Sequence, residues 1–268
     1  MRVLVSATCL YPIKACAPLR VTALAFEPSG DIRGDRAWVV VDADDRVTWQ
    51  GAIPALARII PVGTPDQLAI SSAAGASAVL PPLGQGAPRT VQAWNGQRQA
   101  FDVLAGHDAG DTVAGLASKI AGQPIRIVHL ATTTHRPHPV HIISATSVGA
   151  LAAQLGRTMD LLRFRPNIVL SDDGEPLPPF LEEQATALVC PTAGSQLELK
   201  ITAPCERCIA INVDPDSSAV DDHYLKTVAA HSRGRGVPAP AAFGVYARAT
   251  TGGSLATGDR AELIIAHR

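Results

Sequence analysis

The sequence predicts a mainly β protein with a few helices, an α+β fold made of two apposed β units. Short apolar or alternating runs, bounded by Gly, Pro, Asn and Asp, recur along most of the chain, as is typical of strands. Helical spacing of apolar residues is present in only three segments. Of the 268 residues, 47% are hydrophobic and 18% are charged, so the chain can bury a large core and is not disordered.

The first hundred residues consist mostly of expected strands. These strands cover residues 2–10, 21–27, 37–42, 46–49, 68–71, 90–94 and 98–103. Residues 43–45 are expected to form one hairpin turn, and Asn95-Gly96 a second, because this residue pair favours a two-residue hairpin. The segment 72–89 is rich in Ala, Gly and Pro and is expected to be a surface loop. This half therefore predicts a small antiparallel barrel or sandwich.

The three helical segments follow in the second half. Asp111 is the expected N-cap of the first, whose apolar residues have helical spacing at Val113, Leu116, Ala117 and Ile120. Ser147 is the expected cap of the second, which ends at Gly156 and has the same spacing at Val148, Leu151, Ala152 and Leu155. The third covers residues 222–231. Further strands are expected at residues 125–130, 141–144, 167–170, 196–201, 208–213, 244–249 and 261–266.

Composition and charge exclude several classes of protein. The net charge of −1 argues against a nucleic-acid binder. No stretch of 18 uninterrupted apolar residues is present, so no membrane association is expected. Polar residues interrupt the N-terminal apolar run, which is unlike an export signal, and the chain is therefore expected in the cytoplasm. Cysteines are reduced there, which favours ligand or redox roles for Cys205 and Cys208 over a disulfide.

The segment 203–215 concentrates the most chemistry in the fewest residues. Cys205 and Cys208 are three residues apart, and Arg207 directly precedes the second thiol, where its charge would favour the thiolate. A thiolate at a strand end suits a transition metal or redox chemistry. The pair also allows a structural zinc site, a thioredoxin-like dithiol or two buried structural cysteines. Against the first two, the chain has no second CxxC pair, and a strand rather than a helix is expected after this one.

Other polar clusters give weaker signals. His135, His138 and His141 are evenly spaced, but the prolines between them exclude a helix that would gather the imidazoles, so we interpret them as loop histidines. The strand that leads into residues 144–147 predicts a helix N-terminus, which is either an anion site or an ordinary capped helix. Cations in three further segments are suited to phosphate or carboxylate contacts, at residues 11–15, 33–38 and 163–165.

Taken in chain order, these pieces resemble the MOSC family, the molybdenum-cofactor sulfurase C-terminal domain proteins. The resemblance is to the branch with an N-terminal β-barrel domain, which includes the mitochondrial amidoxime-reducing component and its bacterial relatives. The matching motifs span nearly the whole chain: Tyr11-Pro12-Ile13-Lys14, Gly34-Asp35-Arg36-Ala37-Trp38, Ile143-Ser144 through Ser147, Phe164-Arg165-Pro166-Asn167, Cys205-Glu206-Arg207-Cys208, Val213-Asp214-Pro215, Phe243-Gly244-Val245-Tyr246 and Gly258-Asp259.

The resemblance implies a MOSC-type antiparallel β-barrel over residues 105–268, preceded by a small β-barrel domain over residues 1–104. It also implies that a molybdenum cofactor, Mo-molybdopterin, binds between the two units. Cys208 would be the catalytic residue and the ligand to molybdenum, whereas Cys205 would not be a ligand. The implied contacts to the cofactor are Lys14, Arg36, Ser144, Ala145, Thr146, Arg165, Arg207 and Tyr246.

The implied activity is that of a molybdenum-dependent oxidoreductase that reduces N-hydroxylated compounds, such as amidoximes, hydroxylamines and N-hydroxylated bases. Its electrons would come from an external donor protein, a flavin or iron–sulfur reductase. The alternative is a non-catalytic carrier of the cofactor, or an accessory protein in sulfur transfer. The chain departs from the family pattern at Ala15, where a Ser usually follows the lysine, and this removes one hydroxyl contact.

Overall fold

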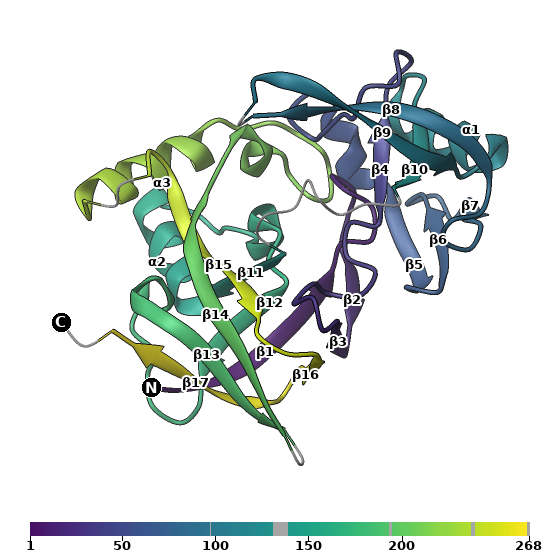
Figure 1. The fold of residues 1–268 in the computed structure, drawn as a ribbon. Coiled ribbons are helices and arrows are strands. Elements are labelled where there is room, and N and C mark those ends of the chain that lie inside the picture. The colour runs from purple at the N-terminus through teal and green to yellow at the C-terminus, as the bar shows by residue number, and fades with distance from the viewer. Residues whose placement is uncertain (97, 131–138, 193–194, 237–238, 267–268) are drawn as a thin grey trace.

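The computed structural model describes residues 1–96, 98–130, 139–192, 195–236 and 239–266, and its fold is mainly β with three α-helices. The main sheet contains eight strands: β1 (Arg2–Leu10), β2 (Leu19–Val21), β11 (Val140–Ser144), β12 (Ile168–Asp172), β13 (Ala185–Thr192), β14 (Ser195–Glu206), β15 (Ala242–Ala249) and β17 (Arg260–Ile265). Their order is β12-β11-β15-β14-β13-β17-β1-β2. Because β12 also pairs with β1, the first seven strands of this order close into a barrel (Figure 1).

The N-terminal half builds a second unit beside the barrel (Figure 1). Its four-stranded sheet, in the order β4-β10-β9-β8, contains β4 (Trp38–Val41), β8 (Ala87–Asn95), β9 (Ala100–Asp108) and β10 (Arg126–Leu130). A three-stranded sheet contains β5 (Ile60–Thr64), β6 (Gln67–Ser71) and β7 (Ser77–Val79). The helix α1 (Asp111–Ala121) packs against β10 and the short 3₁₀ helix η1 (Pro54–Arg58). A separate pair joins β3 (Ala23–Phe26) to β16 (Gly253–Ala256).

The other two α-helices lie together against one side of the barrel (Figure 1). They are α2 (Ala145–Leu155) and α3 (His223–Gly234), accompanied by the 3₁₀ helices η2 (Leu161–Phe164), η3 (Leu181–Gln184) and η4 (Ile209–Asn212). Their apolar faces enclose a second core, in which the rings of Phe164 and Phe243 lie 4.2 Å apart. None of the helices in the described part of the chain has the length and apolar content needed to cross a bilayer.

Residues from both ends of the chain share the main sheet. In β1, Thr8 is paired with Ile168 and Arg2 with Glu262. Conversely, α1 and β10 lie beyond residue 104 in the sequence but pack with the N-terminal sheets. The two β units are therefore interleaved along the chain rather than strictly consecutive.

Several sequence predictions agree with the structure. The strand expected over residues 2–10 coincides with β1, and the three expected helices are present as α1, α2 and α3. Gly156 ends α2 in the left-handed conformation, with φ of 76°, as expected of a C-terminal glycine. A hairpin does form near Asn95-Gly96, between β8 and β9, but its turn is longer than the expected two residues, because Asn95 still pairs with Ala100.

Other predictions of local structure were wrong. The cap of α2 is Ser144, whose hydroxyl accepts a hydrogen bond from Ser147 N, and the cap of α1 is Gly110 rather than Asp111. The strand expected over residues 21–27 is divided between β2 and β3. Residues 46–49 form only isolated bridges, and β7 lies within the segment 72–89 that was expected to be a loop. The sequence analysis also missed β5, β13 and β16.

The strand expected over residues 208–213 is instead the 3₁₀ helix η4. Its backbone hydrogen bonds join residues three positions apart: Ile211 N donates to Cys208 O at 3.2 Å, and Val213 N donates to Ala210 O at 3.1 Å. The alternating apolar pattern was misleading, because a segment of four residues is too short to distinguish the two-residue repeat of a strand from the three-residue repeat of a 3₁₀ helix. Of the three predicted loop histidines, His141 is buried in β11, whereas His135 and His138 lie outside the described residues.

A buried polar junction joins the barrel to the N-terminal unit. The Asp35 carboxylate accepts hydrogen bonds from Tyr11 N at 2.7 Å and Asn167 Nδ2 at 3.2 Å. The same amide nitrogen of Asn167 donates to Cys9 O at 3.2 Å, and its oxygen accepts from His141 N at 3.1 Å. Buried polar groups are costly unless they are paired, so this network favours one arrangement of the segments that it connects.

We expect Asn167→Ala to lower the free energy of unfolding by about 3 kcal/mol, because it leaves buried backbone groups at Cys9 and His141 without their partner. Urea unfolding followed by circular dichroism would measure the change. The exposed amide of Gln85 provides a control, and Gln85→Ala should have little effect. A loss below about 1 kcal/mol in Asn167→Ala would show that the junction does not hold the units together.

Candidate cofactor site

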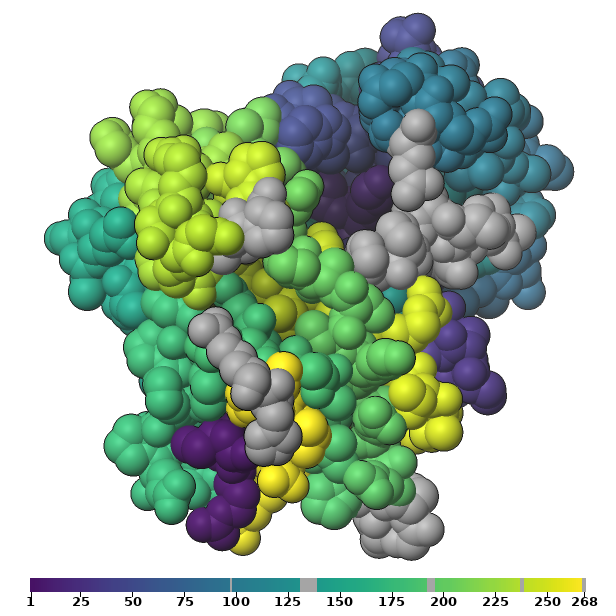
Figure 2. Space-filling model, turned by 60° about the vertical axis from the view of Figure 1, so that its left-hand side comes forward, coloured from purple at the N-terminus to yellow at the C-terminus, as the bar shows by residue number. Residues whose placement is uncertain are grey.

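A cavity of about 270 Å³ lies where the barrel meets the N-terminal unit. A hollow is visible between the green segments and the blue ones in Figure 2, with purple N-terminal residues at its floor. Six of the residues predicted to form a cofactor site line this cavity together: Lys14, Arg36, Arg165, Arg207, Cys208 and Tyr246. The structure thus gathers residues that are spread over more than 230 positions of the sequence.

The arginines of the cavity are held by an aromatic ring and by fixed acceptors. The guanidinium carbons of Arg165 and Arg36 lie 4.3 and 5.6 Å from the centre of the Tyr11 ring. Arg36 forms an ion pair with Asp35, and Arg165 Nη1 donates to Cys16 O at 2.6 Å. Burial, with a smaller contribution from Arg36, lowers the pKa of Arg165 to about 10, so this side chain is still cationic at neutral pH.

Three residues of the cavity wall have an uncommon backbone conformation. The φ angles of Ala15, Arg36 and Arg165 are 69°, 51° and 53°, in the left-handed region that side chains other than glycine rarely adopt. Such residues cost of order 1 kcal/mol or more each and persist where the surrounding structure forces them. Here the strained turns direct two arginine side chains into one cavity.

The two thiols of the CxRC segment have different environments. Cys205 is buried, whereas Cys208 is exposed and lines the cavity at the start of η4. Arg207 was expected to act on Cys208, but its Nη1 lies 2.7 Å from Cys205 Sγ and its Nη2 donates to Phe164 O at 2.7 Å. Side chains two residues apart share one face of an extended chain, which explains why Arg207 contacts Cys205.

The cavity also contains a histidine that the sequence analysis did not assign to it. His141 Nδ1 lies 3.4 Å from Arg165 O, and the ring centre lies 5.9 Å from that of Tyr246. Burial, followed by the charge of Arg207, lowers the pKa of His141 to about 3, so its ring is neutral at physiological pH. Burial and the neighbouring Cys205 raise the pKa of Tyr246, which keeps its hydroxyl protonated. Only the strand predicted for residues 141–144 hinted that His141 is buried.

The predicted helix-start residues Ser144, Ala145 and Thr146 are not among those that line the cavity. The buried carboxylate of Glu182 lies at this helix N-terminus instead, where it accepts from Ser144 N and Ser147 Oγ, each at 3.0 Å. An anion at a helix N-terminus is stabilised by the free N–H groups and the helix dipole, and here the protein supplies that anion itself. A cofactor contact at these three residues stays a prediction.

The donors of the cavity fit a polyanionic ligand. Arg165 Nη2 and Arg207 Nε are buried and have no hydrogen-bond partner among the described residues. Glu206 is the only carboxylate among the residues that line the cavity. A phosphate or another oxygen-rich anion would supply the missing acceptors, and molybdopterin carries a phosphate.

A structural zinc site finds no support at the cysteine pair. In the described part of the chain, neither Cys205 nor Cys208 belongs to a group of three or more His, Cys, Asp or Glu side chains close enough to share an ion. Structural zinc generally requires four such ligands.

The buried His141 predicts an acid-sensitive stability. Its pKa is near 6.5 in an ordinary environment and about 3 in the folded protein, so the unfolded chain binds more protons between these values. Stability therefore falls as the pH drops below about 6.5, by at most about 1.4 kcal/mol per pH unit from this group. We expect a shallower loss in His141→Gln, measured by urea unfolding at several pH values, and an unchanged loss in the exposed, non-titrating control Gln85→Ala. Equal slopes for wild type and His141→Gln would contradict the prediction.

Comparison with known proteins identifies the family of the chain. The family model described as MOSC domain matches residues 122–262, and that described as MOSC N-terminal beta barrel domain matches residues 2–124. The chain is 27% identical over 237 residues to mitochondrial amidoxime-reducing component 1 of Homo sapiens, covering 79% of this chain and 66% of that protein. It is 26% identical over 243 residues to mitochondrial amidoxime reducing component 2 of Rattus norvegicus, covering 81% and 68%.

A second kind of relative is the molybdenum cofactor sulfurase of Drosophila grimshawi, which is 27% identical over 257 residues. That match covers 88% of this chain but only 31% of the sulfurase. The chain thus spans just under two thirds of the human relative and about a third of the sulfurase. Because the two family models together match nearly all of its sequence, the chain belongs to the MOSC domain family, in the form with an N-terminal MOSC beta barrel.

Proposed function

We propose that the cavity binds the molybdenum cofactor and that the protein uses it to reduce N-hydroxylated compounds. The observation that carries this proposal is the convergence of four cationic side chains and one exposed thiol on a single cavity. Two relatives named as amidoxime-reducing components support the reaction, and all three relatives described above are named for amidoxime reduction or for the molybdenum cofactor.

The cavity residues have distinct roles in this proposal. Cys208 would be the protein ligand to molybdenum, because it is the cysteine of the chain whose side chain is exposed. Arg165 and Arg207 would donate to the anionic groups of the cofactor with the nitrogen atoms that have no partner among the residues the structure describes. Lys14 and Arg36, from the N-terminal part of the chain, would add positive charge to the same cavity.

When bound, the cofactor would supply a two-electron reduction of the substrate. The N–OH group takes up two electrons and two protons, the N–O bond is cleaved, and an N–H group and water are formed. The electrons would come from an external flavin or iron–sulfur donor protein. The chain itself holds the anionic groups with fixed charges, so little reorganisation is needed during turnover. Trp49, which is 37% exposed, contributes an apolar wall to the open part of the cavity.

A second candidate function is that of a cofactor carrier or an accessory in sulfur transfer. The match to the sulfurase favours it, because that match includes 88% of this chain. Both candidates require the same bound cofactor, and they differ in whether the isolated protein turns over.

We expect Cys208→Ala to lose at least roughly tenfold in bound molybdenum, because it removes the protein ligand to the metal. Cys205→Ala is the matched control and should retain most of it, since the buried Cys205 contacts Arg207 and does not line the cavity. Elemental analysis and fluorescence of the oxidised pterin would measure both variants from a cofactor-competent host. Wild-type molybdenum content and turnover in Cys208→Ala would refute the assignment.

Turnover with an artificial donor separates the two candidate functions. We expect the molybdenum-loaded protein to oxidise a reduced viologen dye in the presence of an alkyl hydroxylamine, with two dye molecules consumed for each amine formed. The cofactor-free protein is the control and should show no dye oxidation above the background. A fully loaded protein that forms no amine would favour the carrier.

A further inference from the structure

The segment after Cys208 holds this thiol at the mouth of the cavity. Cys208 is the N-cap of η4, and its carbonyl oxygen accepts the first hydrogen bond of that helix from Ile211 N. A helix this short leaves the carbonyl groups at its C-terminal end without intrahelical partners. The position of Cys208 therefore depends on what holds the other end of η4.

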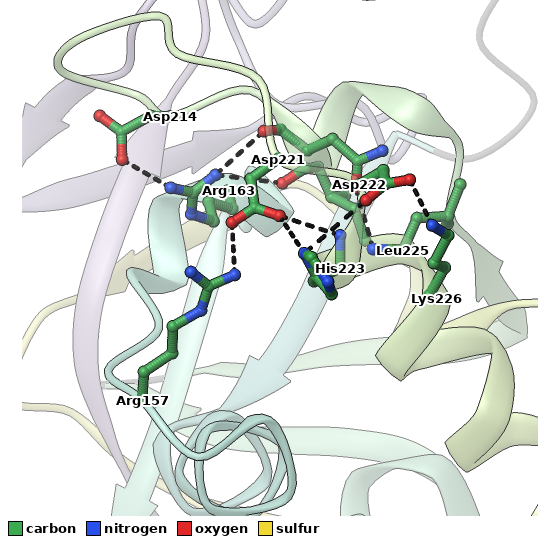
Figure 3. Close-up of polar contacts among 10 residues, drawn as sticks. Arg157, Arg163, Asp214, Asp221, Asp222, His223, Leu225 and Lys226 are labelled. Carbon is green, nitrogen blue, oxygen red and sulfur yellow. Dashed lines mark hydrogen bonds and ion pairs between the residues drawn. The ribbon is translucent and has the colours of Figure 1, made fainter.

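That end is held by Asp221 N, which donates to Asn212 O at 2.9 Å, and by Arg163, whose side chain is only 6% exposed. Its Nη1 donates to the carbonyl oxygens of Ile211 at 3.4 Å and Asn212 at 3.3 Å, while Nη2 donates to Asp214 Oδ2 at 2.5 Å (Figure 3). The guanidinium carbon lies 3.8 Å from the centre of the Tyr224 ring on α3. One side chain thus contacts the carbonyl end of η4, the turn that follows it and a helix behind it.

The turn that carries Arg163 also contributes to the wall of the cavity. Arg165 lies two residues further along and projects into the cavity, and the carbonyl oxygen of Phe164 between them accepts from Arg207 Nη2. The residues 163–165 therefore contact the segments on both sides of Cys208. Arg163 itself is not among the residues that line the cavity.

We propose that Arg163 is a positioning residue that fixes the Cys208 thiol relative to the arginine-lined wall of the cavity. Its planar guanidinium reaches two carbonyl groups and a carboxylate at once, which the single ammonium of a lysine cannot do in the same geometry. The role of Cys208 as metal ligand rests on the proposed function, but the positioning of η4 does not. Residues that orient a metal ligand commonly change metal affinity by 10- to 100-fold when they are replaced.

The neighbouring Arg157 provides a matched control. Its guanidinium carbon lies 5.1 Å from the same Tyr224 ring, and it forms an ion pair with Asp221 (Figure 3). Within the described residues it has no hydrogen bond to η4. Arg157→Lys therefore replaces an arginine at the same ring but removes no side-chain contact to the C-terminal end of η4.

The first test is amide hydrogen exchange on cofactor-free protein. We expect Arg163→Lys to speed exchange at Ile211 and Val213, the two amides hydrogen bonded inside η4, by at least roughly tenfold. Exchange in the barrel strands β1 and β12 should stay within about twofold of wild type, as should exchange everywhere in Arg157→Lys. Asp214→Asn gives a second variant, which removes the carboxylate partner of Arg163 and should produce the same local pattern.

The second test is retention of molybdenum by loaded protein, where Arg163→Lys should lose the metal at least roughly tenfold faster than Arg157→Lys. Exchange at Ile211 and Val213 that matches wild type in both Arg163→Lys and Asp214→Asn would overturn the positioning role, as would a uniform rise that includes β1 and β12. If wild-type protein from a cofactor-competent host contains no molybdenum, the proposed function fails, while the exchange result still decides the role of Arg163.

Discussion

The whole cavity depends on one buried junction, in which Asp35 and Asn167 connect segments that are far apart in the sequence. Asp35 fixes the backbone of Tyr11 at the end of β1, and Asn167 fixes the backbone of His141 in β11. The two side chains are also hydrogen bonded to each other. Arg36 directly follows Asp35 and is paired with it, so the junction also determines where this cation enters the cavity. A second polar contact, from Arg165 Nη1 to Cys16 O, also connects the two parts of the chain at the site.

Placing several cationic side chains in one cavity has an electrostatic cost, and neighbouring groups offset part of it. Arg36 and Arg165 repel each other, and burial disfavours the charge of Arg165. The face of the Tyr11 ring and the Asp35 carboxylate compensate part of this cost. Left-handed backbone at both arginines adds strain of order 1 kcal/mol each. Strain and unpaired donors at the same place are typical of a surface that is arranged in advance for an anion.

Periodicity was sufficient to predict β1 and the three helices, because long regular segments repeat one pattern many times. It failed at η4, where a few alternating apolar residues fit both a strand and a 3₁₀ turn, and at α2, where Ser144 and Ser147 are equally suitable caps by residue type. Six of the predicted site residues do line one cavity, but that prediction came from the family resemblance. The hydrogen bond from Arg207 to Phe164 O could not be predicted, because it depends on packing between segments that are 43 residues apart.

The pairing of β1 with β12 and β17 has a consequence for synthesis of the protein. The first strand to leave the ribosome pairs with residues made about 170 and 260 positions later, as at Val3 with Asp172 and Arg2 with Glu262. Residues 8–10 of β1 can pair early with β2, but the rest of the strand stays an unpaired edge through most of translation. Such an edge is prone to aggregate and is a natural client of chaperones. Barrel closure is the last event, and a chain that stops before β17 leaves its first strand without one of its two neighbours in the barrel.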